Sequence, residues 1–175
     1  VMTEHHAILD PLDRLMRRDE FDVTLLPVSK HDNATIGTID LEQLRAAIRP
    51  DTVLVSVMFA NNEIGTIQPI TEIGSICREH NVLFHTDATQ AIGRIPLDVD
   101  AMHLDLMSFS AHKFYGPKGV GGLYVRRNGP RPKLLPLVDG GGQESGLRAG
   151  TLNPAGIVAM GFALVPNWKL FYAII

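Results

Sequence analysis

Lys113 follows a strand-like apolar run and precedes a segment rich in glycine and proline. The run "DLMSFSA" leads to His112 and Lys113, and the turn "YGPKGVGG" follows Phe114. A deprotonated lysine amine can form a Schiff base with a carbonyl compound. Glycine and proline let the backbone turn sharply and approach a ligand. The motif therefore suggests a Schiff-base lysine, with a solvated loop lysine as the alternative.

Asp87 lies at the end of a second strand-like run, "NVLFHTDA". Pyridoxal phosphate needs a carboxylate beside its ring nitrogen, so that the pyridinium can withdraw electrons, and a lysine for its aldehyde. Asp87 and Lys113 end neighbouring strands and could form this pair, although Asp87 could also cap a helix in "ATQAIG". Ser110, His112 or the glycine-rich backbone could bind the phosphate.

Two other binding chemistries find less support in the sequence. "GPKGVGG" is not a Walker A loop, because glycine rather than Ser or Thr follows Lys118, and it lacks the dinucleotide-binding spacing. His5 and His6, even with His85, make no complete set of ligands at zinc spacing. We therefore predict neither a nucleotide site nor a metal site.

The chain has a single cysteine, Cys77. It shares one face of a predicted helix with Ile73 and Ile76, so we expect a buried, unreactive thiol. One cysteine permits no disulfide within the chain and fits a reducing compartment. The start of the chain lacks the features of a secretory signal, and no apolar run is long enough to span a membrane.

The net charge and the length of the chain indicate which partners to expect and how many domains the chain forms. The 175 residues carry 16 Lys and Arg against 19 Asp and Glu, a net charge of -3, so neither nucleic acid nor an anionic membrane is an expected partner. The length suits one domain with a sizeable core.

Helix-like and strand-like segments alternate, which predicts an α/β fold with a parallel sheet. Pro11 should bound or kink the first helix, and Asp40 should cap the second. Because ligands bind at the carboxyl ends of parallel strands, the strand ends at residues 61–63, 85–87 and 110–113 should bring an amide, a carboxylate and an amine to one edge. We predict helices at 6–18, 41–49 and 71–80, and strands at 21–28, 52–60 (covered on both faces), 81–88, 104–111 and 119–127.

Five ordered motifs resemble the large domain of cysteine desulfurases of the NifS/IscS type, within the class V aminotransferase fold. They are "TEHHAILD", "NNEIGTIQPI", "HTDATQAIGRIPLD", "DLMSFSAHKFYGPKGVGGLYVRR" and "GGGQESGLRAGTLNP". The resemblance implies a fold type I pyridoxal phosphate domain over residues 1–163, with a mostly parallel sheet, flanking helices and truncation at both ends. Residues 164–175 form an atypical tail that suggests a truncation or frameshift.

The resemblance also implies a role for each matching residue. Lys113 would bind the cofactor aldehyde and move protons at the substrate α-carbon, with His5 stacked on the pyridine ring and sharing the acid–base work. Asp87 would pair with the pyridinium. The remaining cofactor contacts would be Gln90 and Asn62 at the phenolic oxygen, Ser110 and His112 at the phosphate, and Thr151 at the phosphate of the other subunit of a homodimer.

The complete enzyme would convert L-cysteine to L-alanine and pass the sulfur to an enzyme cysteine, for iron–sulfur cluster and thio-cofactor assembly through an acceptor or scaffold protein. This chain lacks the family's persulfide cysteine loop, so we expect it to be inactive alone. The alternatives are another class V activity, such as selenocysteine lyase or aminotransferase, and a remnant that only binds cofactor or dimerises. We expect a cytoplasmic protein, or one of the mitochondrial matrix in a eukaryote.

Overall fold

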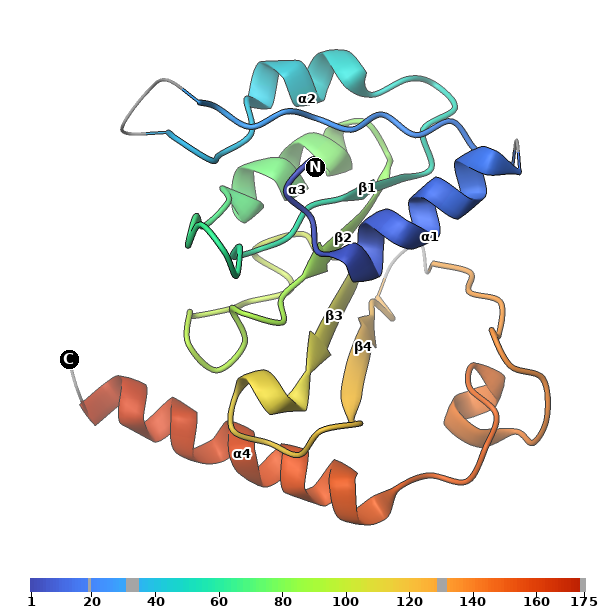
Figure 1. Ribbon diagram of the computed structural model, residues 1–175, viewed down its shortest axis with the longest axis vertical. Helices are drawn as coiled ribbons and strands as arrows, with labels where there is room; N and C mark the ends of the chain where they lie inside the picture. Colours follow the sequence, from blue (N-terminus) through green and yellow to red (C-terminus); the bar gives the residue numbers. More distant parts are fainter. Residues whose placement is uncertain (19, 31–34, 129–131, 174–175) are drawn as a thin grey trace.

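A four-stranded sheet organises the chain, in the order β1-β2-β3-β4 (Figure 1). The computed structural model describes residues 1–18, 20–30, 35–128 and 132–173. The strands are β1 (Leu54–Ser56), β2 (Leu83–Asp87), β3 (Leu106–Ser110) and β4 (Gly121–Val125). The first three are parallel and β4 is antiparallel to β3, so the predicted mostly parallel α/β sheet is confirmed.

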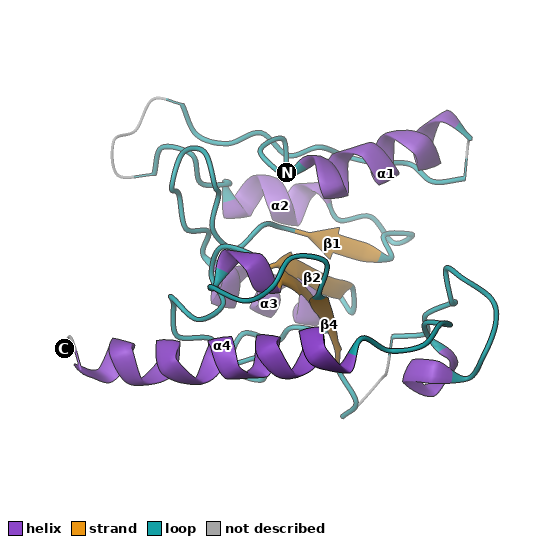
Figure 2. Cartoon of the chain, turned by 60° about the horizontal axis from the view of Figure 1, so that its bottom comes forward, coloured by secondary structure: helices purple, strands orange, loops and turns teal. Residues whose placement is uncertain are grey.

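In the described ranges, four α-helices and two short 3-10 turns accompany the sheet. They are α1 (His6–Arg17), α2 (Leu41–Ala47), α3 (Ile70–Glu79), α4 (Pro154–Ala173), η1 (Ala111–Lys113) and η2 (Gln143–Gly146). Figures 1 and 2 show α2 at the β1 end of the molecule and α4 at the β4 end. Within the described ranges, no helix is long and apolar enough to cross a bilayer.

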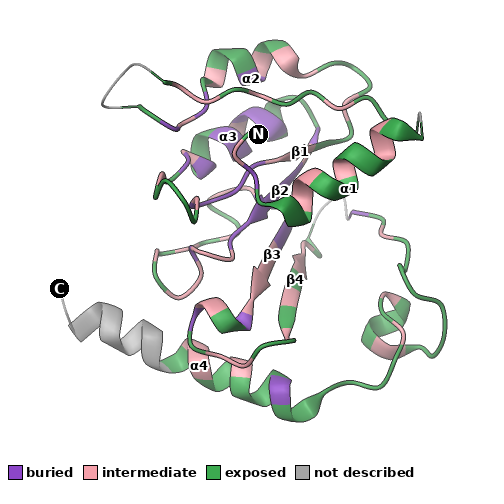
Figure 3. Cartoon of the chain, viewed as in Figure 1, coloured by how far each residue is buried: buried purple, intermediate pink, exposed green. Residues whose placement is uncertain are grey.

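The core fills the space between α3 and one face of the sheet (Figure 3). Val57, Phe84 and Met107 come from three neighbouring strand segments and pack with Ile73 and Ile76 of α3, all with at most 6% of their surface exposed. Cys77 belongs to the same cluster, which confirms its predicted burial. Alternate strand residues, among them Ser56, His85, Asp87 and Ser108, therefore lie on the opposite face.

β4 returns antiparallel because residues 111–120 are too few for the crossover that a parallel strand requires. Gly119 turns the backbone with φ +79°, a conformation that glycine adopts without strain. A Cβ at Gly121 would lie 2.6 Å from the Phe109 carbonyl oxygen, and one at Gly122 would overlap the Phe109 ring. These two glycines thus serve the β3–β4 pairing, whereas the sequence suggested approach to a ligand.

Of the two predictions for Pro11, a helix boundary or a kink, the boundary is wrong and the kink stays a prediction. α1 runs through Pro11 without a break, and its half-buried stripe of Ile8, Leu12, Leu15 and Met16 follows the predicted spacing. Because Pro11 is exposed and removes only one backbone hydrogen bond, the packing of this stripe maintains the helix past it. Asp40 caps α2 as predicted, accepting from the Glu42 and Gln43 amides at 2.8 and 3.3 Å.

Two strand predictions need correction. Residues 21–28 form no strand. Their only β-pairing is an isolated bridge between Val28 and Ile39, because in the described part of the chain no strand lies beside them to form a hydrogen-bonded ladder. In the run 52–60, predicted as one strand, only Leu54–Ser56 form a strand, β1. The prediction that the run is covered on both faces is also wrong, since Val53 and Leu54 are 60% and 43% exposed. β1 ends the sheet order, so one side of this run has no neighbouring strand.

The predicted boundary at residue 163 falls inside α4, which continues to Ala173. That boundary stays a prediction, and residues 174 and 175 of the predicted tail lie outside the described residues.

Candidate functional site

The carboxyl ends of β1, β2 and β3 bring most of the predicted site residues to one edge of the sheet. Ser56 pairs with His85 across β1 and β2, and Asp87 pairs with Ser108 across β2 and β3. The segment Ser110–Lys113 continues directly from β3. The parallel strands thus place Asp87 beside the strand that delivers Ser110, His112 and Lys113, as the sequence predicts.

The Asp87 side chain is buried, with the residue only 6% exposed. One carboxylate oxygen accepts the Thr89 amide at 2.9 Å, and the Ala88 amide donates to the Ser108 carbonyl oxygen at 2.9 Å. The backbone after β2 forms turns rather than the helix considered for "ATQAIG". Asp87 is therefore a fixed carboxylate at the end of a central strand, and only one of its oxygens is occupied by a local amide.

Ser110 and His112 form a second polar group, beyond the end of β3. The Ser110 hydroxyl lies 2.9 Å from His112 Nδ1, and the two residues flank Ala111, which is fully buried and holds the turn in place. The hydroxyl and the imidazole are hydrogen-bonding groups suited to a phosphate. This pair is thus pre-arranged by its own hydrogen bond.

Arg94 connects Gln90 to Lys113. Its Nη1 donates to Gln90 Oε1 at 2.8 Å, and its Nη2 donates to the Lys113 carbonyl oxygen at 2.6 Å. Lys113 itself is half-buried at the end of η1. One guanidinium therefore joins the turns that follow β2 and β3.

His5 caps α1 next to the end of β1. Its Nδ1 accepts the Ala7 amide at 3.0 Å, so in the neutral ring the proton is on Nε2. The preceding residue, Glu4, is buried and accepts the Met58 amide at 2.7 Å, and Asn61 Nδ2 donates to the Thr3 carbonyl oxygen at 2.7 Å. Burial raises the pKa of the Glu4 carboxyl. These contacts attach the His5 segment to the strand end.

Asn62 and Thr151 are not joined to the other site residues by any hydrogen bond among the described residues. Both are exposed, and the neighbouring Asn61, rather than Asn62, closes the turn by accepting the Glu63 and Ile64 amides at 2.8 and 2.9 Å. The segment 132–153, which contains Thr151, swings away from the sheet (Figure 1). The structure thus brings Asp87, Gln90, Ser110, His112 and Lys113 to adjacent strand ends, and among the described residues no hydrogen bond joins Asn62, Thr151 or the exposed His5 to that group.

A hydrogen-bonded row across three strands was not predicted from the sequence. His85 Nδ1 lies 2.8 Å from the Ser56 hydroxyl, and His85 Nε2 lies 3.1 Å from the Ser108 hydroxyl. Burial lowers the pKa of His85, while the Asp87 charge opposes that effect. His85 and Asp87 share a face because side chains alternate along a strand. In the sequence, Ser56, His85 and Ser108 are visible only as polar residues inside apolar runs. The strand register is what brings their side chains together.

Arg94 was also missed, although it lies four residues after Gln90, a spacing at which side chains can meet in helical or turn backbone. Its contact with Lys113 spans 19 residues and depends on the sheet.

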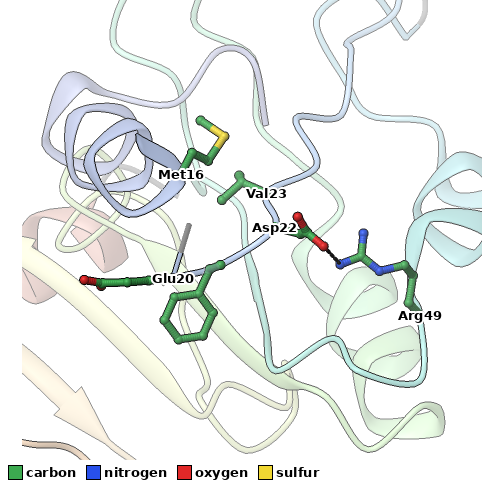
Figure 4. Close-up of a pocket in the computed structure, with 6 residues that line it drawn as sticks. Met16, Glu20, Asp22, Val23 and Arg49 are labelled. Atoms are coloured by element: carbon green, nitrogen blue, oxygen red, sulfur yellow. Dashed lines mark ion pairs between the residues drawn. The ribbon is translucent and has the colours of Figure 1, made fainter. Parts of the chain in front are cut away.

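Two other features lie apart from this edge. A pocket between the end of α1 and the α2–β1 connection is lined by Met16, Glu20, Phe21, Asp22, Val23 and Arg49 (Figure 4). An Asp22–Arg49 ion pair at 3.6 Å crosses it, and none of the predicted site residues lines it. Within the described part of the chain, no three His, Cys, Asp or Glu side chains are grouped to hold a metal ion.

A mostly parallel sheet with a carboxylate and a lysine at adjacent strand ends matches a known class of proteins. The aminotransferase class-V family model matches residues 1–167, and the chain belongs to that family. Among the solved structures, a NifS-like protein superposes with a TM-score of 0.85 at 43% identity, covering 95% of this chain and 44% of that one. SspA in complex with cysteine gives 0.83 at 45% identity, covering 93% and 45%.

Curated relatives narrow the resemblance to cysteine desulfurases. The mitochondrial cysteine desulfurase of Arabidopsis thaliana is 60% identical over 161 residues, and the cysteine desulfurase IscS of Glaesserella parasuis is 56% identical over 163. The alignments cover 92% and 93% of this chain but only 34% and 38% of those proteins. The chain thus spans about a third of the length of these relatives.

Proposed function

We propose that this chain is the cofactor-binding part of a pyridoxal phosphate-dependent cysteine desulfurase. The observation that carries the proposal is the gathering of Asp87, Gln90, Ser110, His112 and Lys113 at adjacent strand ends, in a chain 56–60% identical to cysteine desulfurases. SspA, a structural relative, has been solved with cysteine, the substrate proposed here.

The donor set fits pyridoxal phosphate. Asp87 is buried, and only one of its carboxylate oxygens accepts the Thr89 amide. The other oxygen could therefore accept a hydrogen bond from a protonated ring nitrogen. The Ser110–His112 pair would hold the phosphate, and Lys113 would hold the aldehyde carbon. His5 would stack on the ring, and Gln90 and Asn62 would contact the phenolic oxygen. When bound, the cofactor supplies an electron sink for the substrate α-carbon.

The protein residues would then bind the substrate and move its protons. Asn62 would also contact the substrate carboxylate, and Lys113 and His5 would exchange protons at the α-carbon. The overall step takes L-cysteine and a protein thiol to L-alanine and a protein persulfide, so the sulfur atom and the electrons balance. Cys77 is not that thiol, because burial and the charge of Asp105 raise its pKa to about 12.

The position of Thr151 supports a homodimer within the same proposal. It lies exposed on the segment that swings away from the sheet, where a second subunit could receive it at its phosphate site. We further propose that the protein passes sulfur to an acceptor or scaffold protein. Its compartment would be a reducing one, such as the cytoplasm or the mitochondrial matrix.

The experiment that tests cofactor binding compares Lys113→Ala with Lys118→Ala. The wild-type protein is incubated with pyridoxal phosphate, reduced with borohydride and digested, and the modified peptide is located by mass spectrometry. The modification should lie on Lys113, disappear in Lys113→Ala and persist in Lys118→Ala, since Lys118 is an exposed lysine of the same loop. A wild-type protein that takes up no pyridoxal phosphate, or takes it up on other lysines alone, would contradict the proposal.

The substrate is tested by the visible absorbance of the loaded protein. Adding L-cysteine should change that spectrum at concentrations at which L-serine does not, because the site is proposed to act on the thiol substrate. Equal responses to both amino acids would argue against a cysteine-specific site.

A further inference from the structure

Arg94 makes specific contacts with two residues of the proposed site, although it is not itself assigned to bind the cofactor. It lies in the turn after β2, and its guanidinium reaches the side chain of Gln90 at 2.8 Å and the Lys113 carbonyl oxygen at 2.6 Å. Among the described residues, Arg94 forms no ion pair with a carboxylate. Its short hydrogen bonds are therefore directed at the site rather than at a surface acid.

The contact with Gln90 decides which end of the carboxamide remains available. A guanidinium has only donors, so the Gln90 atom that faces it must be the oxygen. The other end of the carboxamide, the Nε2 group with two donors, is then the end that a ligand can use. Gln90 is fixed as a hydrogen-bond donor, which suits an anionic or carbonyl-like oxygen and excludes an N–H group as its partner.

The contact with Lys113 fixes the backbone from which the lysine amine extends. Lys113 ends η1, where the Phe114 and Gly116 amides both donate to the Ala111 carbonyl oxygen, at 3.1 and 2.9 Å. A charged donor at 2.6 Å from the Lys113 carbonyl oxygen adds a strong restraint at the exposed side of this turn. One side chain thus sets the relative position of the two strand-end turns.

We propose that Arg94 is a positioning residue that holds the Gln90 amide donors toward the cofactor's phenolic oxygen and holds the Lys113 turn at a fixed distance from them. This inference rests on the proposed function. Arginine suits the role because its planar fork donates two hydrogen bonds in fixed directions, which lysine cannot do.

The test is a pH titration of the visible absorbance of the pyridoxal phosphate-loaded protein. A Gln90 donor at the phenolic oxygen stabilises its negative charge and weakens the hold of that oxygen on the proton of the Lys113 nitrogen. Arg94→Met should therefore raise the titration midpoint by about half a unit to one unit, the size of one neutral hydrogen bond. Arg127→Met is the matched control, since Arg127 is exposed and distant in sequence, and it should titrate as the wild type.

Two further variants show whether the effect passes through Gln90. Gln90→Leu removes the donors without adding a charge, and it should raise the midpoint as well. In the double variant with Arg94→Met the two shifts should not add, because both remove the same interaction. Arg94→Lys keeps the charge but not the fork, and it should give an intermediate midpoint; this variant decides the question if Arg94→Met does not fold.

A wild-type midpoint in Arg94→Met or in Arg94→Lys would overturn the inference, as would additive shifts in the double variant or an equal shift in Arg127→Met. These outcomes differ from failure of the proposed function, in which the wild-type protein itself acquires no absorbance and no modification on Lys113.

Discussion

The Ser56 hydroxyl lies 2.8 Å from Nδ1 of His85, and the two residues come from adjacent parallel strands. With Ser108 on the other side at 3.1 Å, the imidazole has a hydroxyl partner at each nitrogen. A neutral ring donates at one nitrogen and accepts at the other, and hydroxyls can satisfy both. This row lies along the face that also carries Asp87.

Acid should destabilise the protein through His85. Burial lowers the pKa of His85 in the folded protein below its usual value of about 6.5, so the unfolded chain binds the proton more readily. The contribution of His85 to stability is complete above a pH of about 6.5 and is lost as the pH falls toward the lowered folded value. Urea unfolding at a pH of about 7.5 and about 5.5 should show this loss. His85→Gln should reduce the difference and His80→Gln, at an exposed position, should not; equal pH dependence in all three proteins would contradict the assignment.

Ser110→Ala and His112→Ala should weaken binding of the phosphorylated cofactor selectively. Each substitution removes one side of the pair joined at 2.9 Å. The loss should be about 1.5 to 3 kcal/mol, or roughly ten- to hundredfold in Kd, for a hydrogen bond to a charged group. Titration with pyridoxal phosphate and with pyridoxal separates the effects, because pyridoxal lacks the phosphate and should bind the variants and the wild type alike. If both compounds lost the same affinity in the variants, Ser110 and His112 would not be phosphate contacts.

The Cys77 thiol should be unreactive in the folded protein. It is 1% exposed, and burial raises its pKa to about 12, so almost no thiolate forms at neutral pH. A disulfide reagent such as dithionitrobenzoate should modify Cys77 only after addition of guanidinium chloride. Rapid modification under native conditions would show that the α3 face opens.

Gly74→Ala should destabilise the protein although alanine favours helices. A Cβ at Gly74 in α3 would overlap the carbonyl oxygen of Met102, and backbone cannot move as a flexible side chain can. Overpacking of this kind costs about 1 to 3 kcal/mol, which exceeds the gain of about 1 kcal/mol in helix propensity. Chemical denaturation measures the change, with Ser75→Ala in the same helix as the control expected to lie close to the wild type. An unchanged or higher stability of Gly74→Ala would show that Met102 moves aside.

The local patterns of the sequence determined much of this protein. Asp40 caps α2 because its carboxylate reaches amides only two and three residues away, and Cys77 is buried because α3 repeats apolar residues at helical spacing. The sequence also predicted Asp87 and Lys113 at strand ends. An apolar run and the polar residue that follows it can be recognised within a few neighbouring residues. The strand expected at 21–28 failed because a strand needs a partner, which no local pattern supplies.

Only the tertiary structure decided how distant residues meet. The Ser56–His85 contact spans 29 residues and the Arg94–Lys113 contact spans 19, and both depend on the order and register of the strands. The direction of β4, the burial of one sheet face and the exposure of Val53 at its edge depend on the same order. Hydrogen bonds between neighbours follow from residue type and spacing, whereas contacts across a sheet form only once loop closure has set which strands lie side by side.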